Sequence, residues 1–261
     1  MIRMFDKGSG PPLIVIPGVQ GRWEWMMPGL KELQKHFRTI AYTLCGDLGS
    51  DMRFEQGAGF ENYVRQLDGI YEKCGIDHAS LIGVSYGGLI ALRYAATRSD
   101  RVTALVLASS PAPGWVPTAR QQAYVARPWR SMPAFVATAP ARVWPEIRAG
   151  CGTWRSQLAF AVTHAGRVVT APMIPSVMAA RVTLQQGIDF SGDCARVQSP
   201  TLIVTGEEPL DSVVPVQITR RYAALIPGAR HQVLERTGHL GMLTQPERFA
   251  TIVTSFITAA R

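Results

Sequence analysis

The sequence predicts an α/β fold with a mostly parallel central β-sheet, helices on both sides, and a helical insertion before the last strands. Short apolar runs alternate with stretches of helical spacing over the first 110 residues, as expected for strands joined by crossover helices. This alternation stops at Pro111 and resumes at Thr201. The length of 261 residues suits one large domain, or one domain with an insertion.

The first 110 residues contain seven predicted elements, in which strands and helices alternate. Leu13–Ile16 is a short apolar run between prolines, which is typical of a buried strand. Residues at 63, 64, 67, 70 and 71 are apolar at helical spacing. The predicted order is strand 13–16, helix 30–37, strand 39–44, helix 60–74, strand 79–84, helix 89–96 and strand 102–108.

Residues 111–200 differ in composition from the rest of the chain. They hold ten of the 18 prolines and four of the six tryptophans, without strand-helix alternation. We expect an irregular, mostly helical insertion. After it, the sequence predicts a strand at 201–205, a helix at 216–225, a strand at 231–234 and a helix at 247–259.

Composition excludes several classes of protein. A hydrophobic content of 47% excludes intrinsic disorder, and four cysteines in so long a chain exclude a disulfide scaffold. We expect Cys45, Cys74, Cys151 and Cys194 to be reduced packing residues. The chain has neither an apolar run of roughly 18 residues nor an apolar leader segment, so we expect no membrane partner and a cytoplasmic location.

The chain is basic, with a net charge of +8, but its charges are dispersed. Only Arg220 and Arg221 are adjacent, which favours a solvated basic surface over a nucleic-acid site. No Cys/His cluster has metal-ligand spacing, so we expect no metal. We also expect no cofactor. The sequence indicates nothing about oligomeric state.

The sharpest motif is Gly83-Val84-Ser85-Tyr86-Gly87-Gly88, which ends a predicted strand and opens a predicted helix. Such a turn is tight and strained, and neighbouring chain leaves no room for side chains at Gly83 and Gly87. It lifts the hydroxyl of Ser85 to the carboxyl edge of the sheet, where ligands bind in open α/β sheets. The N–H of Tyr86 then lies at a helix N-terminus and can bind an oxyanion.

At this motif the chain resembles the α/β-hydrolase family, in its serine-nucleophile esterase or hydrolase form with a lid, over nearly all of its length. The resemblance implies a core made of residues 1–110 and 201–261, with residues 111–200 as a helical lid (cap) insertion. The family's catalytic order is serine, acid, histidine. The position of the acid corresponds here to the loop from Gly206 to Pro215, and that of the histidine to Gly238-His239.

The resemblance implies a role for each residue. Ser85 is the nucleophile, His239 takes and later delivers its proton, and Asp211 orients the imidazole. Asp211 best matches the expected distance to Val214-Pro215. Glu207 and Glu208 are alternatives, because many relatives carry the acid nearer to the glycine.

The second oxyanion donor is expected in the loop after the first central strand. The family often has His-Gly there, whereas this chain has Pro17-Gly18-Val19-Gln20. By position we expect the N–H of Val19 to be the donor, with Gln20 as an alternative contributor.

Candidate walls of the substrate pocket are mostly aromatic. They are Gln20, Trp23, Trp25, Trp144 and Leu240, and hydrophobic packing is the alternative role for the tryptophans. The segment 111–200 also carries nine arginines against three acidic residues. The electrostatic field of a basic lid would attract anionic substrates. A solvated basic surface is an alternative explanation of the same excess of arginines.

The function implied is a serine hydrolase that cleaves a small carboxylic ester through an acyl-serine intermediate, with a small-molecule ester or related acyl compound as its partner. A lactonase or a carbon–carbon bond hydrolase on the same triad is an alternative. A ligand-binding homologue without turnover is a third possibility.

Overall fold

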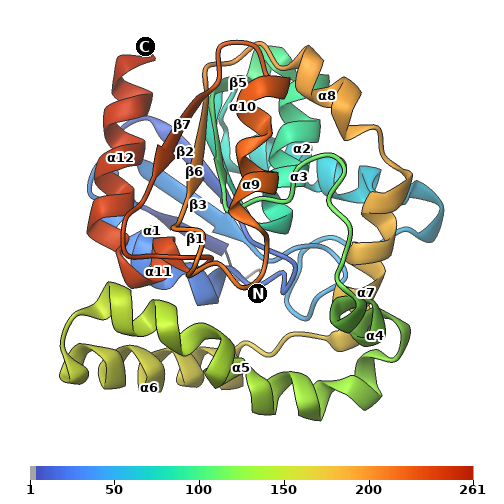
Figure 1. Ribbon diagram of the computed structural model, residues 1–261. Helices are drawn as coiled ribbons and strands as arrows, with labels where there is room; N and C mark the ends of the chain where they lie inside the picture. Colours follow the sequence, from blue (N-terminus) through green and yellow to red (C-terminus); the bar gives the residue numbers. More distant parts are fainter. Residues whose placement is uncertain (1–3, 261) are drawn as a thin grey trace.

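The apolar runs of the chain form the strands of one sheet in the computed structural model, which describes residues 4–260 (Figure 1). Six of the strands had been predicted, three of them (β4, β5 and β6) with the observed bounds. The strands are β1 (Met4–Lys7), β2 (Pro12–Ile16), β3 (Arg38–Tyr42), β4 (Ala79–Val84), β5 (Val102–Ala108), β6 (Thr201–Thr205) and β7 (Arg230–Val233).

The strand order is β1-β3-β2-β4-β5-β6-β7. Every neighbouring pair is parallel except β1 and β3, which pair antiparallel from Met4 opposite Tyr42 to Lys7 opposite Thr39. The predicted mostly parallel sheet is therefore confirmed, with an additional antiparallel edge strand that the sequence did not indicate. The order places β4 in the interior of the sheet, between β2 and β5.

Strand β2 shows how the two faces of the sheet are covered. Leu13 and Val15 pack into one apolar cluster with α1 and α12, whereas Ile14 and Ile16 pack into another with α2, α3 and α8. All four side chains are fully buried, which stabilises the fold by about 1.5–3 kcal/mol for each side chain. The covering helices are α1 (Met27–Leu33), α12 (Pro246–Ala259), α2 (Glu61–Cys74), α3 (Tyr86–Thr97) and α8 (Phe190–Arg196).

Three predicted helices differ from the structure. The helix expected over 89–96 begins earlier, at Tyr86 directly after Ser85, and ends at Thr97. The helix expected over 30–37 begins earlier, at Met27, because Pro28 fits the first turn, and it ends at Leu33. The helix expected over 216–225 is divided into α9 (Val216–Arg220) and α10 (Tyr222–Leu225). The N–H of Arg221 bonds to the carbonyl three residues back, which tightens the chain at this junction.

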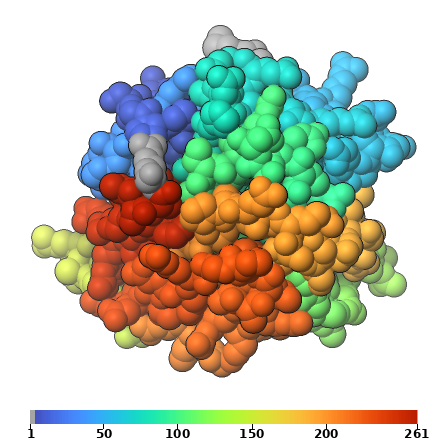
Figure 2. All heavy atoms as spheres, turned by 90° about the horizontal axis from the view of Figure 1, so that it is seen from above, coloured from blue at the N-terminus to red at the C-terminus, as the bar shows by residue number. Residues whose placement is uncertain are grey.

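The insertion contains helices and no strand within residues 111–200. Helices α4, α5 and α6 lie as a separate layer across one end of the sheet, and α7 leads back to the core (Figure 1). Figure 2 is turned by 90° and shows the molecule from above, where α12 and residues near 200–230 form much of the surface. The bounds are α4 (Ala119–Ala126), α5 (Pro128–Cys151), α6 (Trp154–Thr170) and α7 (Pro175–Leu184).

Helix α8 belongs to the same predicted insertion but packs differently. Phe190 and Cys194 are buried in the cluster that α2 and α3 form against the sheet. The description of 111–200 as a lid thus applies by position to α4–α7, and it stays a proposal. None of the helices within residues 4–260 is long and apolar enough to cross a membrane.

The remaining helical segments are short. They are the four-residue α11 (Gly241–Thr244) and the 3-10 turns Trp23–Met26, Gln56–Ala58, Ser99–Arg101 and Gln185–Gly187.

Candidate active site

Ser85 lies at the junction of β4 and α3 in a backbone conformation that residues other than glycine rarely adopt. Its φ is 52° and its ψ is −122°. The turn is held from both sides, because the Ser85 N–H donates to the Ala108 carbonyl at 2.8 Å and the Gly88 N–H donates to the Ser85 carbonyl at 2.9 Å. A strained backbone that the surrounding structure holds in place is common at functional sites. This conformation therefore marks Ser85 as a candidate functional residue.

The glycines around Ser85 are required by close backbone approach. A Cβ on Gly83 would lie 2.4 Å from the Cα of Gly88, and a Cβ on Gly87 would lie 2.3 Å from the Ile16 carbonyl oxygen. Side chains cannot occupy these positions without moving backbone. The steric reason expected from the sequence motif is therefore present at both glycines.

Asp211 and His239 come together from two loops at the carboxyl ends of β6 and β7. The Nδ1 atom of His239 lies 3.2 Å from Oδ2 of Asp211. The other oxygen, Oδ1, accepts the N–H groups of Val213 and Val214, both at 3.0 Å. The Asp211 side chain is 2% exposed and that of His239 is 12% exposed. The carboxylate is thus fixed by three hydrogen-bond partners and shielded from water.

The two groups perturb each other's titration. Burial alone would raise the pKa of the Asp211 carboxyl, but His239 and the two backbone N–H groups outweigh it and the pKa is lowered. Burial opposes the charged form of His239, but the Asp211 charge and hydrogen bond outweigh burial and raise the pKa of the imidazole. Asp211 therefore stabilises the imidazolium, as a base in proton transfer requires.

The two alternative acids face other groups. Oε1 of Glu207 accepts the N–H of Arg236 at 2.8 Å, which fastens the loop leading to His239. Glu208 contacts the side-chain amide of Gln217 on the surface. Of the three candidates, Asp211 is the one that the structure places against His239.

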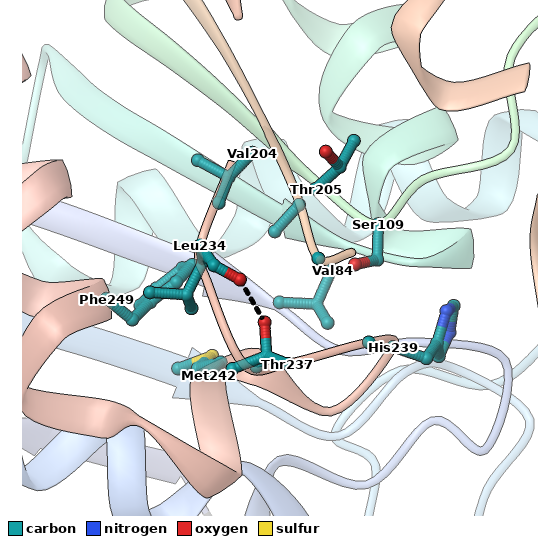
Figure 3. A pocket seen from close by; sticks show the side chains of 13 residues that line it. Val84, Ser109, Val204, Thr205, Leu234, Thr237, His239, Met242 and Phe249 are labelled. Carbon is teal, nitrogen blue, oxygen red and sulfur yellow. Dashed lines mark hydrogen bonds between the residues drawn. The ribbon is translucent and has the colours of Figure 1, made fainter. Parts of the chain in front are cut away.

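A small cavity of about 10 Å³ lies behind His239, which is room for about one water molecule (Figure 3). It is too small for a substrate. Val84, the residue before Ser85, lines it together with His239 and Ser109, so His239 lies near the end of β4 that leads into Ser85. Figure 3 shows His239 at one edge, apart from the apolar side chains of Leu234 and Phe249.

The predicted oxyanion loop runs alongside Ser85. A Cβ on Gly18 would lie 3.3 Å from the Cβ of Ser85 and 2.8 Å from Oε1 of Gln20. Gly18 and Gly21 close a turn by a 2.9 Å backbone hydrogen bond. Tyr86 is the first residue of α3, where backbone N–H groups lack a partner within the helix. The loop that carries Val19 and Gln20 therefore lies close to Ser85, and the assignment of the Val19 and Tyr86 N–H groups as oxyanion donors stays a prediction.

Arg181 on α7 holds this loop, a role that the sequence analysis missed. Its guanidinium is fully buried and donates to the carbonyl of Val19 at 2.9 Å, to that of Cys45 at 3.1 Å and to the hydroxyl of Tyr63 at 3.3 Å. It also forms an ion pair with the buried Asp47. The expectation that the lid arginines face solvent or an anionic substrate is therefore wrong for Arg181.

Other arginines of residues 111–200 also have partners within the protein. Arg142 lies over the ring of Phe135 and Arg155 over that of Trp154. Arg196 pairs with Asp193, whose side chain is fully buried. These contacts weaken the hypothesis of a lid that selects anions.

The predicted pocket walls occupy different surroundings. Trp23 packs on Phe5 with ring centroids 5.7 Å apart, and the indole N–H of Trp25 donates to the Ala171 carbonyl at 3.0 Å. Trp144 is 42% exposed on α5. Leu240 adjoins His239 and is half-buried. The three tryptophans have packing or solvent contacts here, and their contact with substrate stays a prediction.

Glu146 is a second residue that the sequence analysis did not single out. It lies on α5, is 2% exposed, and its Oε1 accepts the Leu240 N–H at 2.8 Å. A single glutamate in a helical sequence is typical of a solvated residue, so no sequence pattern indicated a role for Glu146. Among residues 4–260, no group of three or more potential metal ligands is gathered in one place.

Known proteins resemble this chain across nearly its whole length. A family model described as "Alpha/beta hydrolase family" matches residues 13–252. The 2-hydroxy-6-oxo-2,4-heptadienoate hydrolase of Pseudomonas putida is 27% identical over an alignment of length 273, which covers 98% of this chain and 92% of that protein. The poly(3-hydroxyalkanoate) depolymerase of Ectopseudomonas oleovorans is 25% identical, covering 96% and 85%.

Solved structures agree with the fold. A thermophilic esterase from Thermogutta terrifontis superposes with a TM-score of 0.79 and 24% identity, covering 99% of this chain and 93% of that one.

Proposed function

The chain belongs to the alpha/beta hydrolase family, and from this premise we propose that it hydrolyses a small carboxylic ester through an acyl-serine intermediate. One observation carries the proposal. Ser85 is held at a φ of 52° on the turn after β4, and the residue before it, Val84, lines the same small cavity as His239, whose Nδ1 lies 3.2 Å from Oδ2 of the buried Asp211. Serine is a weak nucleophile at neutral pH and needs such a base.

The first half of the reaction forms the acyl-enzyme. His239 takes the proton of Ser85 through Nε2 while Oγ attacks the ester carbonyl. The carbonyl oxygen becomes an oxyanion, which the N–H groups of Val19 and Tyr86 stabilise. The tetrahedral intermediate then collapses, the bond to the alkoxy group breaks, and the imidazolium returns its proton to the departing alcohol.

The second half regenerates the enzyme. His239 removes a proton from water, which attacks the acyl-serine carbonyl and forms a second oxyanion at the same donors. The bond to Oγ breaks, Ser85 recovers the proton from the imidazolium, and the carboxylic acid leaves. Asp211 stays ionised throughout, and its lowered pKa favours this.

The relatives support hydrolysis in general and differ in substrate. One is named as a hydrolase of 2-hydroxy-6-oxo-2,4-heptadienoate, and this 27% identical relative favours a dienoate of that kind as a second candidate substrate. Cleavage of such a compound breaks a carbon–carbon bond, and the proposed triad suits water addition to its ketone as well.

A substrate panel on wild-type protein and two serine variants tests the proposal. We expect turnover of p-nitrophenyl acetate or butyrate, measured by release of p-nitrophenolate, and loss of nearly all of it in Ser85→Ala. Ser109→Ala is the matched control, because Ser109 is a second serine with a positive φ and it lines the cavity that His239 borders.

The same panel separates the alternatives. Turnover of the dienoate alone, followed by loss of its absorbance, would favour the second candidate. Covalent labelling of Ser85 by an organophosphonate without turnover of any substrate would favour a ligand-binding protein. Ser85→Ala keeping a tenth or more of the wild-type kcat would refute the proposed nucleophile.

A further inference from the structure

Glu146 is a buried carboxylate that the proposed triad does not use. It lies near the end of α5, is 2% exposed, and accepts the N–H of Leu240 on Oε1 at 2.8 Å. Burying a carboxylate is costly unless it is hydrogen-bonded, and a hydrogen bond to a charged group is stronger than one between neutral groups. Leu240 is the residue after His239, so this bond fastens the backbone that carries the imidazole.

The same face of α5 makes two further hydrogen bonds nearby. Positions 142, 146 and 150 are four residues apart, so they share one face of the helix. The hydroxyl of Ser212 donates to the Arg142 carbonyl at 3.3 Å, and the side-chain amide of Gln245 donates to the Gly150 carbonyl at 2.8 Å. Ser212 directly follows the proposed acid. One face of a lid helix therefore contacts both the acid loop and the histidine loop.

The charges around His239 come from two elements. Asp211 approaches from the acid loop and Glu146 from α5, and both negative charges favour the imidazolium. Glu146 itself faces His239 and Asp211, with the Cys151 thiol on its own helix. Burial raises the pKa of the Glu146 carboxyl, while the N–H groups of Leu240 and Gly238 oppose that rise.

We propose that Glu146 is a positioning residue, which holds the histidine loop at the distance from Asp211 that catalysis needs and adds a second negative charge beside His239. This inference rests on the proposed function, because it assigns a role relative to that triad. It also makes the position of the histidine depend on the lid helix, although α5 and His239 are almost a hundred residues apart in sequence.

The test uses two substitutions with different chemistry. Glu146→Gln keeps the shape and an oxygen that can accept the Leu240 N–H, but it removes the charge. We expect kcat to fall by about three- to tenfold and the acidic limb of the kcat/KM profile to move to lower pH, because the imidazolium loses one of its two negative neighbours. The imidazole signal of His239 in NMR should titrate at lower pH as well.

Glu146→Leu removes both the charge and the acceptor. We expect kcat to fall by about ten- to hundredfold with a smaller change in KM, because the imidazole loses its alignment. Glu235→Gln is the matched control. Its carboxylate lies in the chain leading to His239 but is exposed and contacts Arg248, so activity and pH profile should stay as in wild type.

The outcomes separate this inference from the proposed function. Wild-type kcat and an unmoved pH limb in both Glu146 variants, with Ser85→Ala inactive, would overturn the role of Glu146 alone. An active Ser85→Ala protein would overturn the proposed function instead. Thermal melts check that each variant folds. Where Glu146→Leu does not fold, the charge-removing Glu146→Gln decides through its pH limb and the NMR titration.

Discussion

Replacing Asp211 by asparagine tests the proposed acid, and the structure fixes how the new amide must point. Two backbone N–H groups, those of Val213 and Val214, donate to Oδ1. The asparagine carbonyl must stay there to accept them, so its NH₂ group is directed at Nδ1 of His239. Nδ1 then accepts a hydrogen bond, the ring proton moves to Nε2, and Nε2 can no longer take the proton of Ser85.

The expected loss follows from this wrong tautomer. Forcing it costs about 10⁴-fold in kcat in a serine protease triad, which corresponds to about 5 kcal/mol of transition-state stabilisation. We expect a loss of this order for Asp211→Asn with a small change in KM. The assay is steady-state hydrolysis of a p-nitrophenyl ester, with a thermal melt to show that the variant folds.

Glu208→Gln is the matched control, because Glu208 lies on the same loop but faces Gln217 on the surface. It should keep wild-type activity. An Asp211→Asn protein within tenfold of the wild-type kcat would refute the reasoning, most clearly if Glu208→Gln were the inactive variant.

Three further predictions follow from the geometry. The kcat/KM of the wild type should fall as pH decreases through a pKa above about 6.5, because Asp211 raises the pKa of His239 and the catalytic base must be neutral. An acidic limb of the pH profile with a pKa below that value would contradict the pairing of His239 with Asp211. Gly87→Ala should destabilise the fold by about 1–3 kcal/mol in urea titrations, since its Cβ meets backbone, whereas Gly69→Ala on an open helix face should not. Arg181→Met should cost about 3–5 kcal/mol by leaving Asp47 buried without its partner, and a change under about 1 kcal/mol would speak against the buried ion pair.

Local patterns were enough to predict most of the sheet and the turn at Ser85. Strands such as β4 and β5 are continuous apolar runs because both faces are covered, and the glycines mark where backbone approaches backbone. Strand β1 was missed because Met4–Lys7 mixes Phe5 with two charged residues, as suits a partly exposed edge. The helix over 30–37 was misplaced because Pro28 was not taken as its first turn.

The residues missed at the site depend on contacts between distant segments. Arg181 and Glu146 resemble solvated residues in sequence, since nothing in their neighbourhood shows that the core faces them. Each is buried because its helix packs against a loop far away in the chain: the Val19 loop for Arg181 and the His239 loop for Glu146. Periodicity reports which face of a helix is apolar, but it does not report a charged group that finds its partner across the fold.

The most direct measurement of the central claim, that Ser85 is a nucleophile activated by His239 and Asp211, is covalent labelling by a fluorophosphonate. Oγ displaces fluoride and forms a bond to phosphorus, and the adduct is located by mass spectrometry of peptides. We expect one adduct, on Ser85, with labelling slowed by about a hundredfold or more in His239→Ala. No adduct on Ser85, or an adduct on another residue such as Ser109, would contradict the claim.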